Sequence, residues 1–109
     1  MPPEDRVRLL HMIEAAEDAM SFVAGKERTE LEQDRKTLFA VIRCIEIIGE
    51  AATRISETTR TATPDIPWSA IVGMRNRLVH AYFDVDTDVV WKTTAIELPA
   101  LRSRLLALV

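Results

Sequence analysis

The residues that could carry chemistry are concentrated in one short segment, residues 74–82, which is Met-Arg-Asn-Arg-Leu-Val-His-Ala-Tyr. On an ideal helix, at 100° per residue, Arg75 lies near the centre of an apolar face, while Asn76 and His80 lie together on its flank. That apolar face comprises Trp68, Ile71, Val72, Leu78 and Val79. An unpaired buried charge is costly, so an arginine at this position needs a partner or a ligand.

Three interpretations of Arg75 remain open from the pattern alone. The guanidinium could form a structural ion pair with a carboxylate of the preceding helix, such as Glu46 or Glu50. It could extend its stem along the core and place its charged head at the rim. It could also line a cleft and bind phosphate with its planar fork.

His80 is equally ambiguous when it is considered alone. A single histidine late in a helix can cap the last carbonyl groups. Together with Arg75, however, it could support RNA cleavage through the 2′-hydroxyl group. That reaction needs a group that exchanges protons near neutral pH and a fixed cation for the phosphorane, which histidine and arginine supply. No metal is required for this chemistry, and we expect no cofactor.

Other candidate sites are weaker. His11 and His80 lie far apart in the sequence and lack the spacing of a zinc-binding helix, which argues against a metal site. Cys44 is the only cysteine, so an internal disulfide and a multi-cysteine metal site are excluded. Cys44 lies within an apolar segment, and we expect a buried, unreactive thiol.

Composition and charge limit the classes of protein that the chain can represent. The 109 residues are 48% hydrophobic and 28% charged, which excludes intrinsic disorder and predicts one domain, residues 1–109. The net charge of −3 argues against a nonspecific duplex binder, so any contact with RNA must come from a local patch. No apolar stretch reaches the ~20 residues of a membrane span, and the first residues do not resemble a signal peptide. We therefore expect a cytoplasmic protein.

Helical periodicity dominates the chain and predicts an all-α fold, an antiparallel up-and-down bundle of four main helices. The expected helices cover residues 4–24, 29–56 and 68–81, and a fourth begins near residue 87 with Asp86 or Thr87 as its cap. Residues 58–67 and 83–86 are expected to be a loop and a short connection. Thr29 and Glu32 fit a capping box at the start of the long second helix.

Three positions predict where these helices end, approach or bend. Gly25 is a natural stop for the first helix. Gly49, in the middle of the second, suggests a close approach of another helix. Pro99 predicts that the last helix is kinked or split.

The motif and its surroundings resemble a known family. Residues 75–80 match the RNxxxH form of the R-x4-H motif of HEPN domains, and with Ala81 and Tyr82 they give the R-x4-H-x-Tyr pattern of the HepT-type branch. Further segments similar to that family are residues 47–52, 66–68, 71–74 and 98–101. R-x4-H alone is a weak pattern, whereas the ordered set along a chain of this length is fairly specific.

The resemblance implies a helical bundle that forms a homodimer, with two copies of the motif facing one composite cleft. It implies a metal-independent endoribonuclease that is the toxin of a toxin–antitoxin pair. The implied partner is a minimal nucleotidyltransferase antitoxin, which silences the toxin by transferring AMP from ATP to the motif tyrosine, here Tyr82.

The resemblance also suggests roles for the motif residues. Arg75 would hold the scissile phosphate and His80 would act as general base or acid. Asn76 would orient the phosphate or His80, and Arg77 would add positive charge to a groove shared by two protomers. Tyr82 would lie at the mouth of the cleft as the site of AMPylation, where the added group repels RNA.

Two other functions are compatible with the same residues. The chain could be a non-catalytic HEPN-like module that binds a nucleotide or only its nucleotidyltransferase partner. It could also be a plain dimeric bundle, in which Arg75 forms a buried bidentate pair and His80 caps a helix.

Overall fold

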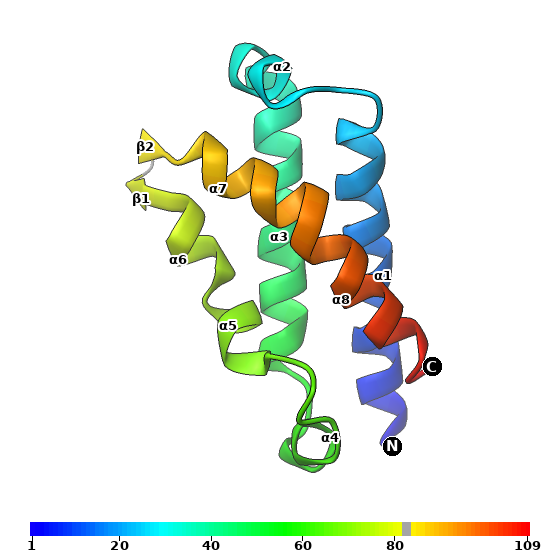
Figure 1. Cartoon of the computed structure of the whole chain (residues 1–109). Coiled ribbons are helices and arrows are strands. Elements are labelled where there is room, and N and C mark those ends of the chain that lie inside the picture. Colours follow the sequence, from blue (N-terminus) through cyan, green and yellow to red (C-terminus); the bar gives the residue numbers. More distant parts are fainter. Residues whose placement is uncertain (82–83) are drawn as a thin grey trace.

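Two long antiparallel helices, α1 (Pro3–Val23) and α3 (Arg35–Thr53), form the centre of the molecule (Figure 1). The computed structural model describes residues 1–81 and 84–109, and the side chains of all of these except His80 and Ala81. Small side chains let the two helices pack closely, since Ala15, Ala16 and Ala19 of α1 and Ala51 and Ala52 of α3 are all buried. Gly25 follows α1 with a φ of 74°, which confirms that it ends the first helix.

The predicted helix 29–56 is wrong at both ends. A separate short helix, α2 (Arg28–Gln33), precedes α3. The non-helical backbone of Asp34 separates the two helices. The Asp34 carboxylate accepts hydrogen bonds from the backbone N–H (3.1 Å) and the hydroxyl (2.7 Å) of Thr37. Asp34 is therefore the N-cap of α3, and the capping box expected at Thr29 is replaced by an N-cap residue, Glu27, without a side-chain bond.

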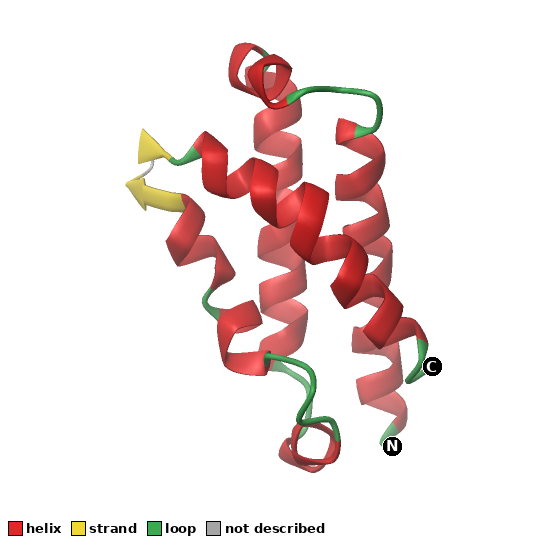
Figure 2. Ribbon diagram, viewed as in Figure 1, coloured by secondary structure: helices red, strands yellow, loops and turns green. Residues whose placement is uncertain are grey.

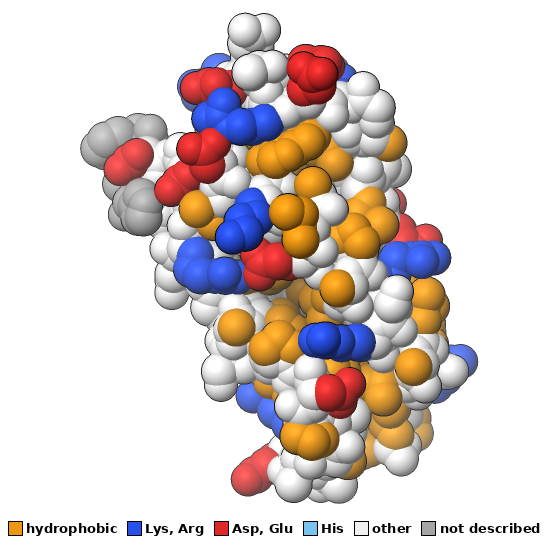
Figure 3. Space-filling model, viewed as in Figure 1, with side chains coloured by type: hydrophobic (Ala, Val, Ile, Leu, Met, Phe, Trp, Pro, Cys, Tyr) orange, Lys and Arg blue, Asp and Glu red, His pale blue; other side chains and the backbone are white. Residues whose placement is uncertain are grey.

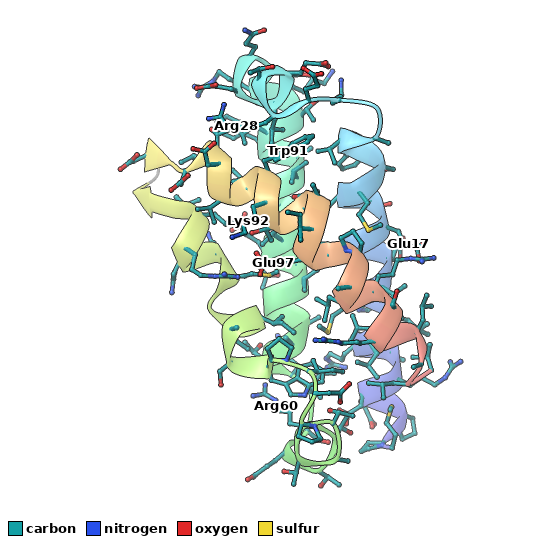
Figure 4. All side chains as sticks on the ribbon, viewed as in Figure 1. Glu17, Arg28, Arg60, Trp91, Lys92 and Glu97 are labelled. Carbon is teal, nitrogen blue, oxygen red and sulfur yellow. The ribbon has the colours of Figure 1, made fainter. Side chains whose placement is uncertain are left out.

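The expected loop 58–67 begins with a helix, α4 (Glu57–Ala62), which is a correction to the sequence prediction. Ser56 caps this helix through a hydrogen bond from the Thr59 N–H to its hydroxyl, at 3.3 Å. Arg60 of α4 donates to the carbonyl oxygens of Ala52 (2.6 Å) and Ile55 (3.2 Å), so it satisfies the C-terminal end of α3 (Figure 4). The N-cap bond at Ser56 and the two bonds from Arg60 stabilise α4, and helix propensity along residues 57–62 does not indicate them.

Asp5, in the first turn of α1, is a buried carboxylate that connects α1 to α4. It is 2% exposed and accepts hydrogen bonds from the N–H and hydroxyl of Ser56 (3.0 and 2.6 Å) and from the Thr59 hydroxyl (2.5 Å). Burial alone would raise the pKa of Asp5, but these hydrogen bonds and the nearby Arg8 outweigh it and hold the pKa below its ordinary value of 3.8.

The third predicted helix, residues 68–81, is also divided. Helix α5 (Trp68–Val72) ends at Gly73, helix α6 (Met74–Leu78) follows, and the chain then enters strand β1 (Val79–Ala81). Strand β1 pairs antiparallel with β2 (Asp84–Val85) to form the hairpin drawn in yellow in Figure 2.

The helix ends at Leu78, whose carbonyl oxygen accepts a hydrogen bond from outside the helix. The Asp86 N–H donates to the Leu78 carbonyl oxygen at 2.8 Å, and the β-branched Val79 adopts an extended conformation opposite Val85. The expected connection at residues 83–86 is therefore partly a strand.

The last helix consists of α7 (Thr87–Lys92), a π-helical turn η1 (Thr93–Glu97) and α8 (Leu98–Leu106), which together cross α1 and α3 (Figure 1). The Asp86 carboxylate accepts the Val89 N–H at 3.1 Å, which confirms the predicted cap. The Leu98 N–H reaches back to the carbonyl of Thr93. This wider turn lies directly before Pro99, which cannot donate a hydrogen bond, but the chain stays helical from Thr87 to Leu106. The kink or split expected at Pro99 stays a prediction.

One hydrophobic core joins these elements, and the all-α fold is confirmed. The largest fully buried apolar side chains are Leu9, Met12, Leu31, Val41, Ile45, Ile48, Leu78, Val90, Leu98 and Leu105. Four uninterrupted helices are not observed, because two of the expected helices are segmented. Within the described ranges, no helix is long and apolar enough to cross a membrane.

We expect Asp5→Asn to lower the free energy of unfolding by about 1–3 kcal/mol at neutral pH, because it weakens charged hydrogen bonds at a buried site. Since the folded-state pKa of Asp5 lies below 3.8, its contribution is present above that pH and is lost as the pH falls through the folded-state pKa. Urea unfolding across this range should show the two proteins converging in acid. The exposed neighbour provides a control, as Glu4→Gln should change stability by less than about 0.5 kcal/mol. An equal loss at every pH would contradict the assignment.

Candidate functional site

The position of the motif helix is fixed by a close contact at Gly49 of α3. A Cβ atom added there would lie 3.4 Å from the carbonyl oxygen of Ile71 and 3.6 Å from that of Val72. The end of α5 therefore rests on the backbone of α3, which confirms the predicted close approach. Because α6 begins one residue after Gly73, this contact also determines the position of Arg75 relative to α3.

Arg75 is paired but exposed. Its Nε donates to the Glu46 carboxylate at 2.9 Å, and 51% of the Arg75 side chain is accessible to solvent. The pairing that the sequence suggested is thus present, whereas the buried bidentate bridge expected of a purely structural role is not. Among the described residues, the two terminal nitrogens of this guanidinium have no hydrogen-bond partner.

Arg75 and Asn76 line one open groove between α6 and the C-terminal half of α3. The other lining residues are Glu46, Gly49, Glu50, Thr53, Arg54 and Val72. Positions 46, 49, 50 and 53 share one helical face, so the spacing of three and four along α3 could have identified this wall of the groove from the sequence.

Arg77 lies on a different side of α6. It faces Glu97 of η1, with 3.7 Å between the charged atoms, and Figure 4 shows Glu97 pointing from η1 toward α6. Arg77 lines a second groove together with Ile71, Met74 and Leu101, over the face shown in Figure 3. The structure therefore does not bring Arg77 together with Arg75 within one chain.

His80 lies in β1 and not on a helix. The predicted helical spacing of Asn76 and His80, one turn apart, is wrong because the backbone leaves the helix at Val79. Tyr82 lies outside the described residues, so its place at the mouth of the groove stays a prediction.

The remaining candidates from the sequence are Cys44 and His11. Cys44 is buried, as predicted, and burial raises the pKa of its thiol above the ordinary value. His11 lies on α1, where it lines a third groove beside Arg8 and Arg54. Among the described residues, no three His, Cys, Asp or Glu side chains are grouped to hold a metal ion.

The fold is a small helical domain in which Arg75, the first residue of the R-x4-H motif, is exposed in a groove, and sequence comparisons identify its family. The model of the family described as "Ribonuclease HepT-like" matches residues 12–108. The chain belongs to this HepT-like ribonuclease family, which confirms the HEPN/HepT resemblance.

Curated relatives support the assignment. The chain is 36% identical to "Putative RNase MJ1216" of Methanocaldococcus jannaschii over 94% of its own length and 85% of the relative. It is 48% identical to "Probable ribonuclease HepT" of Thermococcus cleftensis over 65% of the chain and 64% of that protein. "Putative RNase MJ0125" of M. jannaschii is 35% identical over 94% of the chain and 89% of the relative. No solved structure matches the chain significantly.

We expect Gly49→Ala to leave the free energy of unfolding unchanged or raise it by up to about 1 kcal/mol. Its Cβ would make ordinary contacts at 3.4 and 3.6 Å, and alanine favours the helix. Gly49→Leu should destabilise by about 1–3 kcal/mol, because the larger side chain must displace α5 or fill the groove. Urea denaturation measures both effects. Thr53→Leu, one turn further along the same face, is the size-matched control. Equal effects of leucine at 49 and 53 would contradict the close approach.

Proposed function

We propose that this protein is a metal-independent endoribonuclease that cleaves RNA through attack of the 2′-hydroxyl group on the adjacent phosphate. The observation that carries the proposal is the exposed Arg75 in a groove beside Asn76, where Glu46 is its one hydrogen-bond partner among the described residues. Membership of the HepT-like ribonuclease family supports the same reaction class.

The geometry of Arg75 suits phosphate binding. Glu46 holds the guanidinium through Nε, which leaves the terminal nitrogens to approach two phosphate oxygens as a fork. An exposed ion pair of this kind stabilises a protein by only about 0–1 kcal/mol, so a phosphate can compete for the arginine. Arg75 would stabilise the charge that develops on the phosphorane.

His80 would act as the general base or acid, and Asn76 would orient the phosphate. Both are close in sequence to Arg75, and the backbone bond from Asp86 to Leu78 anchors the hairpin that carries His80. With an ordinary pKa near 6.5, histidine exchanges protons near neutral pH. This pairing of roles needs no metal ion.

We further propose that the active form is a homodimer with a composite cleft. Arg77 lies on the opposite side of α6 from Arg75, so its part in phosphate binding would require the motif of a second chain. Two exposed apolar side chains would be covered in such a dimer: Val72 (39%), which lines the groove of Arg75, and Ile96 (62%), the neighbour in sequence of Glu97.

The regulatory proposal concerns Tyr82. The chain would be the toxin of a toxin–antitoxin pair, and a minimal nucleotidyltransferase antitoxin would transfer AMP from ATP to the phenol oxygen, releasing pyrophosphate. The family resemblance of the R-x4-H-x-Tyr pattern supports this step. The transferred group would bring negative charge and bulk next to His80 and repel the RNA phosphates.

We expect the purified protein to cleave RNA in the presence of EDTA and to leave an RNA with 2′-deoxy substitutions intact. His80→Ala should reduce the cleavage rate by about 10²–10⁴-fold, the usual contribution of a general acid or base. Arg75→Ala should reduce it by at least about 10²-fold through lost charge stabilisation. Cleavage of a labelled RNA under single-turnover conditions measures these rates.

Light scattering and urea unfolding of each variant provide the structural control, and we expect dimers of unchanged stability. Arg35→Ala, on the distant end of α3, should cleave like the wild type. RNA that is bound but left uncut by the wild type would favour the non-catalytic nucleotide-binding module. Full cleavage by His80→Ala would contradict its catalytic role.

We expect Tyr82→Phe to abolish AMPylation by the partner nucleotidyltransferase while leaving the fold unchanged. Tyr82 is the only tyrosine, so a label transferred from α-labelled ATP to a phenol has one possible acceptor. Intact-mass spectrometry should show added AMP on the wild type and none on the variant. Co-expression with the partner should then rescue growth for the wild type only. Equal labelling of both proteins would place the modification elsewhere.

A further inference from the structure

The groove that holds Arg75 continues across α3 into a second one. The continuation lies between α1 and α3 and is lined by Arg8, His11, Ile47, Glu50, Ala51 and Arg54. Glu50 and Arg54 line both grooves, so the two form one continuous surface. We call this surface the α3 track.

Charge along the α3 track is unevenly compensated. Its two carboxylates are engaged, since Glu46 pairs with Arg75 at 2.9 Å and Glu50 pairs with Arg43 at 3.1 Å. Arg54, in contrast, is exposed and pairs with no carboxylate among the described residues.

Arg8 is compensated only at a distance. Its guanidinium donates to the Glu4 carbonyl oxygen of its own helix, at 3.3 Å. It lies close enough to lower the pKa of Asp5, but the Asp5 carboxylate is already bonded by Ser56 and Thr59. Arg8 and Arg54 therefore leave positive charge at the end of the track away from Arg75.

We infer that Arg8 and Arg54, together with His11, form an accessory site that binds the RNA backbone beyond the scissile phosphate. The inference rests on the proposed function, since the track begins in the groove of Arg75. Guanidinium groups bind phosphates as planar forks, and His11 adds a further hydrogen-bonding group. A chain with a net charge of −3 needs such a local path to attract a polyanion.

A labelled single-stranded RNA provides the direct test. In the His80→Ala background, which prevents cleavage, we expect Arg8→Gln combined with Arg54→Gln to weaken the binding of an RNA of about 20 nucleotides by about tenfold at 0.1 M salt. The slope of log affinity against log salt should become shallower by about 1.4, the value for two lost phosphate contacts on a single strand. The loss should be much smaller for an RNA of about 4 nucleotides. Fluorescence anisotropy measures all three quantities.

Matched variants separate the track from general charge effects. Arg35→Gln removes one charge about 28 Å away along the axis of α3 and should leave RNA affinity unchanged. Arg54→Lys keeps the charge and should retain most of the affinity. Urea unfolding of each variant reports whether the fold is kept.

The outcomes distinguish the inference from the proposed function. Unchanged affinity and salt slope in the double variant would overturn the accessory site, whatever the cleavage assay shows, and would leave this surface for a protein partner. A loss as large for Arg35→Gln as for Arg54→Gln would also overturn it. If the protein with His80 intact cleaves no RNA, the proposed catalysis fails, while the anisotropy measurement still decides the binding site.

Discussion

The contact between Gly49 and the carbonyl groups of Ile71 and Val72 is the constraint on which the candidate site depends. A side chain larger than that of alanine at position 49 would enter the space in which the end of α5 meets α3. With glycine there, α6 starts close to α3, and Arg75 reaches Glu46 across the gap. The groove thus takes its shape from backbone packing, and its polar side chains extend from helices that are already held by the core.

Asp86 has a comparable role at the other end of the motif. Its backbone N–H donates to the Leu78 carbonyl oxygen, and its carboxylate accepts the N–H of Val89. One residue thereby ends α6, closes the hairpin and begins α7. The backbone position of His80 depends on this junction, because the hairpin has only a few residues and two short strands.

Features determined by local chemistry were predictable from the sequence. Gly25 ends α1 and Asp86 caps α7, and each of these depends on the conformational preference of one residue. The R-x4-H motif was equally visible, because its residues are neighbours in the chain. The family assignment and the helical fold followed from such signals.

Features that depend on distant partners were not predictable in this way. Helix α4 is completed by bonds from Ser56 and Thr59 to Asp5, more than fifty residues away. The prediction of one helix over residues 68–81 assumed a constant rotation of 100° per residue. The turn at Gly73 interrupts that rotation and separates α5 from α6. Once that rotation is interrupted, Met74 and Leu78 face the core and Arg75 turns outward. The ideal-helix projection therefore placed Arg75 on the wrong side of the helix.

The exposure of Arg75 decides what its ion pair can do. A buried pair would hold the arginine in place, and breaking it would cost about 3–5 kcal/mol, which would prevent a substrate from competing. The observed pair is open to water and uses only Nε, so Glu46 orients the guanidinium at small energetic cost and leaves its fork accessible. Glu46 also lowers the net positive charge of the groove, and a polyanionic substrate then needs further cations nearby. Arg54 and Arg8 lie along the same surface, and neither forms an ion pair within 4 Å among the described residues, although Arg8 lies near the Asp5 carboxylate. In the proposed mechanism, a carboxylate of α3 would orient Arg75, while Arg8 and Arg54, at the other end of the same surface, would attract the polyanion.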